Sequence, residues 1–143
     1  MLPPGIRTVA VPTFVNETTE PLLEAEITRA VIAEIQRDGA LRIVAAGEAD
    51  AVLKGRIRAF TMNPVSYTRD DALRAEEYRI ILTAAYTLVN AKTGAVVSEH
   101  PQVEGDATFQ VIGDLTTSKQ NGLPTAARDL AHDLVEKIVE TWR

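Results

Sequence analysis

The stretch that most constrains the fold of this chain is residues 5–39, where a short apolar strand leads directly into an amphipathic helix. β-Branched and apolar residues at 6–11 favour a strand, which Pro12 ends because proline has no N–H to donate to a ladder. From Glu20 to Asp38, apolar residues recur every three or four positions before a stop signal at Gly39, so this segment is predicted to be a helix. The apolar segment 41–44 is predicted to be the next strand. Two strands joined by a helix are expected to lie parallel, with a right-handed crossover.

Three longer strands and a second helix are predicted in the rest of the chain. The strands cover 51–61, 78–89 and 95–109, and Pro101 inside the last one favours an edge strand or a bulge. Gly94 is expected to close a tight turn that makes the last two strands antiparallel. Residues 62–77 are polar and are expected to form a connection well above the usual hairpin length. The second helix is expected to open at Pro124, and Trp142 continues its apolar stripe, so we expect that ring in the core rather than serving as an anchor.

The predicted order of elements is therefore β-α-β-β-β-β-α. Each helix has one apolar stripe, and strands with one apolar face can cover it. The economical solution is an α+β fold with two layers. Both amphipathic helices pack on one face of a mixed four- to five-stranded sheet, and the other face stays open. A length of 143 residues is typical of one domain, so residues 1–143 are predicted to form a single unit.

Composition excludes several classes of function. The formal net charge of −5 argues against a nucleic-acid partner, because phosphate binding requires a basic surface. The chain has no cysteine, which rules out disulfides, thiolate metal sites and cysteine catalysis. The sequence contains no run of about 20 apolar residues, so no membrane-spanning helix is expected.

The sequence shows no arrangement of residues that predicts catalysis. His100 and His132 lie on different predicted elements, and neither has a second histidine at the spacing of metal ligands. Asp70 and Asp71 are interpreted as a charged loop tip, since adjacent acids without a following glycine and glutamate do not match a calcium loop. A small hydrolase would need a clustered acid–base pair, which the sequence does not offer. We therefore expect no enzymatic activity, no metal and no cofactor.

The most informative surface feature is a row of cations on alternate residues of the strand 51–61. Leu53, Ile57 and Ala59 are expected to face the core, and the cations to face the other way. The row consists of Lys54, Arg56 and Arg58, lies between Val52 and Phe60, and is extended by Arg79 on the next strand. Two interpretations stay open. The cations pair with Glu104 and Asp106 across a solvent-facing sheet, or they form a docking surface for an anionic ligand or partner.

Several segments together carry a resemblance to a known family. They are Gly5–Pro12 followed by Asn16–Thr18, the helix 23–39, the segment Ala49–Gly55, the turn Thr93–Gly94 and the final helix 127–142. In combination they resemble the LptE family of lipopolysaccharide-assembly lipoproteins, over nearly the whole chain. The resemblance implies a non-enzymatic, two-helix, mixed-sheet domain tethered to the inner leaflet of the outer membrane, facing the periplasm. It further implies that the domain sits inside the large β-barrel LptD, helps this barrel assemble and takes part in handling lipopolysaccharide.

The chain departs from the family at its front. It begins Met1–Pro4 and contains neither a signal peptide nor a cysteine that could carry a lipid. Membrane attachment is therefore expected only through an N-terminal lipid anchor that this chain lacks. The family's lipopolysaccharide-contacting residues do not fall in a motif that aligns here. The assignment of Lys54, Arg56, Arg58 and Arg79 as lipopolysaccharide-binding residues rests on strand chemistry, since the phosphates of lipid A are anionic.

An alternative resemblance uses the same opening. The pattern Val-Ala-Val-Pro-x-Phe-x-Asn-x-Thr before a helix is similar to the amino-terminal domain of TolB and to the LpoB-type activators of cell-wall synthases. This alternative would make the chain a periplasmic regulatory or binding domain for another envelope protein. The long strand pair after Ala49, with its 16-residue connection, favours the LptE family.

Overall fold

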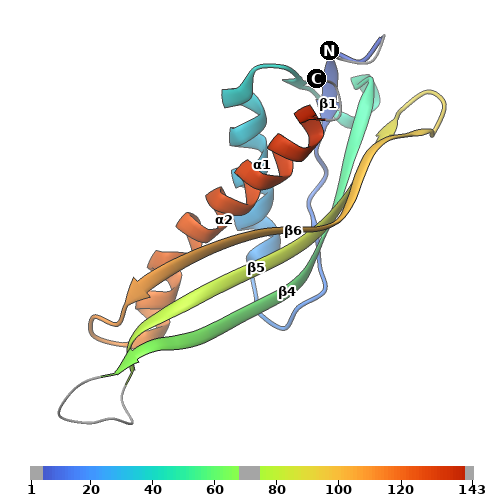
Figure 1. Cartoon of the computed structure of the whole chain (residues 1–143). Helices are drawn as coiled ribbons and strands as arrows, with labels where there is room; N and C mark the ends of the chain where they lie inside the picture. The colour runs from blue at the N-terminus through green and yellow to red at the C-terminus, as the bar shows by residue number, and fades with distance from the viewer. Residues whose placement is uncertain (1–4, 68–74, 141–143) are drawn as a thin grey trace.

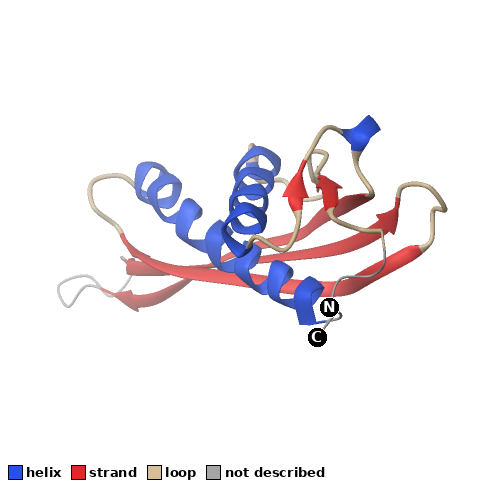
Figure 2. Cartoon of the chain, turned by 90° about the horizontal axis from the view of Figure 1, so that it is seen from above, coloured by secondary structure: helices blue, strands red, loops and turns tan. Residues whose placement is uncertain are grey.

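The computed structural model describes residues 5–67 and 75–140. In chain order the elements are β1 (Thr8–Ala10), β2 (Val15–Asn16), α1 (Leu23–Asp38), β3 (Arg42–Ile43), a short 3₁₀ helix (Ala46–Glu48), β4 (Ala51–Tyr67), β5 (Ala75–Asn90), β6 (Val96–Gln110) and α2 (Leu115–Glu140). Both helices lie on one side of the sheet (Figures 1 and 2), which confirms the predicted α+β fold. The predictions for Asp70, Asp71 and Trp142 concern residues outside the described ranges.

The sheet is mixed, with the strand order β3-β1-β4-β5-β6 and with β2 pairing beside β4. β1 runs parallel to β3 and to β4, as expected for strands joined through a helix. β4, β5 and β6 form a long antiparallel meander, which confirms the tight turn at Gly94. β6 ends the strand order, and the register slips opposite Ala85, so Pro101 lies beside a bulge in an edge strand.

The short strand β2 was not predicted, so the sheet has six strands rather than four or five. Two predictions of element boundaries were also wrong. Most of the expected polar connection 62–77 is strand, because β4 continues to Tyr67 and β5 begins at Ala75. The second helix begins at Leu115 rather than at Pro124, which lies inside α2. The Asp114 carboxylate accepts hydrogen bonds from the N–H and the hydroxyl of Thr117, at 2.8 and 2.9 Å, and so caps this earlier start.

The core lies between the helices and the helix-facing side of the sheet. Its fully buried side chains include Ile27 and Val31 of α1, Leu130 and Leu134 of α2, and Leu53, Ile57, Ile80, Leu82 and Leu88 of the sheet. Phe14 packs against the backbone of β4 at Gly55, where an added Cβ would lie 2.2 Å from the Phe14 ring. Any larger residue at this position of β4 would have to displace the buried Phe14 ring.

Two of the segments that carry the family resemblance have structural roles near the N-terminus. The Asp50 carboxylate accepts hydrogen bonds from the N–H groups of Arg7 and Thr8, at 2.9 and 3.1 Å, and so fastens β1. The Asn16 side chain accepts a hydrogen bond from the N–H of Thr18 and donates to Glu24, each at 3.0 Å. These contacts fix the connection from β2 into α1.

A β-bulge divides β4 into two halves. Ile57 pairs with Ala84 and Ala59 pairs with Thr83, so Arg58 is an extra residue in the ladder. The bulge reverses which side chains face the core from that point on. Phe60 packs against the core, whereas the simple alternation predicted it beside the cations and placed Ala59 inside. That part of the face prediction was wrong.

Candidate functional site

Three of the four candidate cations lie together on the open face of β4. The side chains of Lys54, Arg56 and Arg58 are exposed, and they stand opposite the buried Leu53 and Ile57 as predicted. Arg56 forms an ion pair with Glu17, with 3.7 Å between Nη1 and Oε2. Lys54 and Arg58 form no ion pair within residues 5–67 and 75–140. We call these three residues the basic row.

A shallow hollow of about 340 Å³ adjoins the basic row. Its walls come from three strands, and the lining residues are Arg56, Arg58, Ala85, Tyr86, Thr87, Glu99, His100 and Pro101. The register slip near Ala85 lies at this hollow, where β6 departs from regular pairing with β5. Two guanidinium groups on one strand face can together bind a phosphate or a carboxylate through several donors. Glu99 adds one carboxylate to the same hollow, so the site is cationic but not uniformly so.

Arg79 does not join the basic row. It stands opposite Asn63 on the far half of β4, roughly 15 Å beyond Arg58 at about 3.3 Å per residue. Its Nε lies 2.8 Å from Oδ2 of Asp106 on the neighbouring strand β6, and the two side chains form an ion pair. The pairing with Asp106 matches the solvent-facing-sheet interpretation for this one cation. The other three cations pair with neither Glu104 nor Asp106.

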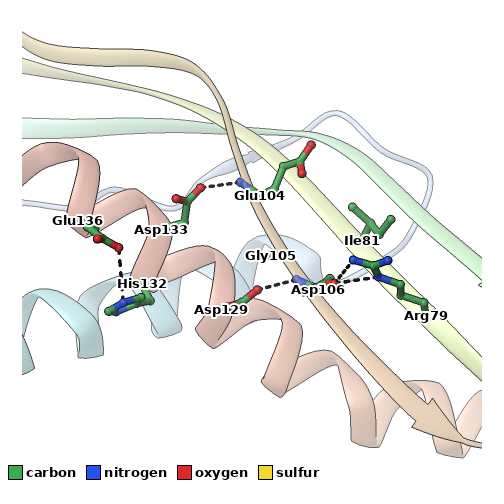
Figure 3. Close-up of a pocket in the computed structure, with 9 residues that line it drawn as sticks. All are labelled: Arg79, Ile81, Glu104, Gly105, Asp106, Asp129, His132, Asp133 and Glu136. Atoms are coloured by element: carbon green, nitrogen blue, oxygen red, sulfur yellow. Dashed lines mark hydrogen bonds and ion pairs between the residues drawn. The ribbon is translucent and has the colours of Figure 1, made fainter.

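A second hollow, of about 380 Å³, lies where α2 crosses β6 (Figure 3). It is lined by Arg79, Ile81, Glu104, Gly105, Asp106, Asp129, His132, Asp133 and Glu136. Carboxylates therefore dominate it, and it lies at the β6 edge of the meander, whereas the basic row lies on β4. No motif in the sequence indicates this hollow, because its acids come from two separate elements, β6 and α2.

Two of these acids have a structural role at the edge of the sheet. The N–H of Glu104 donates to Asp133 at 3.0 Å, and the N–H of Asp106 donates to Asp129 at 2.9 Å (Figure 3). These backbone donors point away from β5 and would otherwise be open to another strand. Between them, Gly105 allows α2 to approach the strand closely, since an added Cβ would lie 2.2 Å from the backbone nitrogen of Leu130. Helix α2 thus covers this part of the β6 edge.

Hydrogen bonds shift the pKa values of two side chains in this hollow, Asp133 and His132. Burial acts to raise the pKa of the Asp133 carboxyl, but hydrogen bonds from Lys137 and from the N–H of Glu104 outweigh burial, so its pKa is lowered. His132 lies 3.2 Å from Glu34 of α1 and 3.6 Å from Glu136. The hydrogen bond to Glu34 raises the pKa of His132 above its ordinary value, and so this side chain links the two helices most strongly when charged.

Among the described residues, no three histidine or acidic side chains are arranged so that they could hold a metal ion. His100 and His132 line different hollows, in keeping with their placement on different predicted elements. Across residues 5–67 and 75–140, no helix is both long and apolar enough to cross a membrane.

The fold is that of a small α+β domain with two charged surfaces. The chain belongs to the LptE family, described as lipopolysaccharide-assembly, whose model matches residues 6–142. This assignment confirms the resemblance carried by the opening, the Ala49–Gly55 segment and the final helix, and it favours that resemblance over the TolB and LpoB alternative. The family is one of non-catalytic lipoproteins of the cell envelope.

Solved structures from several bacteria share the fold at low sequence identity. A protein from Xanthomonas campestris is 12% identical with a TM-score of 0.62, over 99% of this chain and 90% of that one. A minor lipoprotein from Acinetobacter baumannii is 9% identical with a TM-score of 0.60, over 95% and 94%. The dodecameric PelC from Paraburkholderia phytofirmans is 16% identical with a TM-score of 0.57, over 94% and 89%. Comparison with curated protein sequences gives no match.

Proposed function

We propose that this chain acts without catalysis in the export of lipopolysaccharide to the outer membrane, by plugging an LptD-type β-barrel and assisting its assembly. In this role it works at the periplasmic face of the outer membrane, held by an N-terminal lipid anchor. The observation that carries the proposal is the match to the lipopolysaccharide-assembly family over residues 6–142.

The surfaces of the fold support a role as a plug. Helices cover one face of the sheet, and the other face presents polar and charged side chains such as Lys54, Arg56 and Thr87. The interior of a large outer-membrane barrel is itself polar, so a domain with a polar sheet face suits it better than an apolar one would.

We further propose that the basic row binds the phosphate groups of lipopolysaccharide. Lys54 and Arg58 have no ion-pair partner among the described residues, so their charges are available to a ligand. Each charge-assisted hydrogen bond to a phosphate contributes roughly 1.5–3 kcal/mol net. Arg79 contributes less in this scheme, because Asp106 already neutralises it.

The test is to purify the natively anchored protein from detergent-solubilised outer membranes and to identify its partner by mass. We expect a large β-barrel in one-to-one proportion. A periplasmic synthase or a Tol component in its place would overturn the proposal and move the chain to the alternative class. A protein that purifies alone would likewise contradict the plug role.

A further inference from the structure

The far half of β4 is a sheet edge that pairs with no strand of the described residues other than β5. On the side away from β5, β1 pairs with β4 at Ala51–Val52 and β2 pairs with it at Arg56–Ile57. The last contact of this kind is the N–H of Glu17 donating to the carbonyl of Ile57 at 2.9 Å. Beyond the bulge, β4 continues to Tyr67 with β5 on one side and no described strand on the other (Figure 1).

The register fixes which backbone groups are open. The N–H of Glu104 donates to α2, so it points away from β5, and the neighbouring Gly105 forms the backbone hydrogen bonds to β5. Backbone groups point in alternating directions along a strand. Those of Thr83, which stands opposite Glu104, therefore point away from β6 and toward β4. Ala59, Thr61 and Asn63 are therefore bonded to β5, and the backbone groups of the residues between them point outward. The open groups are the N–H and carbonyl of Phe60, the N–H and carbonyl of Met62, and the carbonyl of Pro64. We call this set the open edge.

Pro64 fits this assignment independently. Proline is tolerated in a strand where its nitrogen faces away from the ladder, as it does here. It also limits the open edge, because Pro64 offers a carbonyl but no N–H to a strand that pairs with it. On the β6 side, by contrast, Asp129 and Asp133 already cover the outward N–H groups of Asp106 and Glu104. The protein thus caps one edge of its meander and leaves part of the other open.

The residues around the open edge indicate what kind of strand could pair with it. Phe60 and Met62 are half-buried on the helix side, so an added strand needs apolar side chains on that side. On the other side lies the unpaired Arg58. Where β2 covers the neighbouring part of β4, Glu17 pairs with Arg56, so an incoming strand is expected to place an acid near Arg58 in the same way. A second copy of this chain would bring the same cations to its own edge, which disfavours self-pairing.

We propose that an extended segment of the barrel partner, alternately apolar and polar with an acid near Arg58, adds to the open edge as a further strand. This inference rests on the function proposed above, because it names the same partner. Strand addition satisfies backbone donors and acceptors that otherwise bond to water, and the flanking side chains provide its selectivity.

The experiment measures amide hydrogen exchange at single-residue resolution, in the free protein and in the complex purified with its barrel. We expect the amides of Phe60 and Met62 to exchange roughly tenfold more slowly or better in the complex, while those of Thr61 and Asn63 are slow in both states. A complex in which Phe60 and Met62 exchange as in the free protein would overturn the strand-addition inference and leave the proposed function standing. Failure of the barrel to co-purify would overturn both.

A matched pair of variants supplies the second arm. Met62→Pro removes an outward donor without breaking the ladder to β5, and Met62→Ala removes the side chain but keeps that donor. We expect the Met62→Pro variant to co-purify with about one fifth or less of the barrel that the Met62→Ala variant retains. Thermal unfolding is recorded for both variants. Equal retention would contradict the inference. Sedimentation shows whether the free chain dimerises. If the amides of Phe60 and Met62 were protected in such a dimer, a second copy of this chain would be the strand that pairs with the open edge, and the inference would be contradicted.

Discussion

The Asp129 carboxylate on α2 accepts a hydrogen bond at 2.9 Å from the backbone N–H of Asp106, which lies 23 residues earlier in the chain. Asp129→Ala leaves that edge donor to water, and we expect it to lower the free energy of unfolding by about 0.5–1.5 kcal/mol. Chemical denaturation measures the change. Asp129→Asn keeps a side-chain oxygen as acceptor and is the control, which we expect to retain most of the stability. Equal losses in the two variants would show that the hydrogen bond is not responsible.

Gly105 is expected to be the least replaceable glycine of the sheet. In Gly105→Ala the new Cβ would meet the backbone of α2, at 2.2 Å from the Leu130 nitrogen and 2.4 Å from the Ala126 carbonyl oxygen. Because the backbone of a helix cannot move aside as a side chain does, we expect a loss of about 1–3 kcal/mol or more. The matched control is Gly47→Ala, where nothing lies within 4 Å of the added Cβ. Similar unfolding midpoints for the two variants would refute the close approach.

His132 is expected to make stability depend on pH. Its hydrogen bond to Glu34 raises the pKa of His132 in the folded state, so the charged form stabilises the fold. That contribution is complete below the ordinary histidine pKa of about 6.5 and is lost as pH rises through the raised folded pKa. Arg37 of α1 opposes the effect, and Glu136 adds to it.

The measurement is the unfolding midpoint at pH 6 and at pH 8 for the wild type and for His132→Gln. We expect the wild type to lose more stability over this interval than the variant does. The difference is expected to be small, because the His132 side chain is 66% exposed and water screens its ion pairs. A variant with the same slope as the wild type would assign the pH dependence to other groups.

The basic row is expected to control binding of phosphorylated lipid. Replacing one of its cations by glutamine should weaken binding of lipid A vesicles about tenfold, and replacing Lys54, Arg56 and Arg58 together should weaken it by about a hundredfold or more. These side chains are exposed, so thermal stability should change little. Arg79→Gln is the control and should have a smaller effect, because Asp106 already pairs with Arg79. Equal binding of dephosphorylated lipid A would rule out phosphate recognition.

The alternation of side chains predicted much of this structure, and it failed where the ladder is irregular. Along β5 the predicted faces hold throughout, with Ile80, Leu82 and Leu88 buried. Along β4 they hold up to Ile57 and fail at the bulge. Ala59 and Phe60 are both apolar, so the sequence there carries no signal for the change of face.

Contacts that depend on packing between distant segments were beyond the sequence. The alternation along each strand placed Arg79 and Asp106 on the same face, but the separation of Arg79 from the basic row follows from the full register of β4 and β5. The pairing of Asp129 with Asp106 depends on how α2 crosses β6. The early start of α2 was missed because Pro124 is typical of a first helical turn, whereas here it lies inside the helix.

The bulge at Arg58 keeps the apolar side chains of both halves of β4 on the core face. Phe60 and Met62 stand opposite the buried Leu82 and Ile80, and paired residues share one face of a sheet. Deleting Arg58 would therefore make the pairing regular and leave the following side chains of β4 on the faces that they now occupy. If the bulge were lost while Arg58 remained, the register would slip by one residue, Phe60 and Met62 would face water, and Thr61 and Asn63 would face the core. The extra residue thus acts like a one-letter insertion that restores a reading frame in three dimensions, and most substitutions at the exposed Arg58 should leave the fold intact.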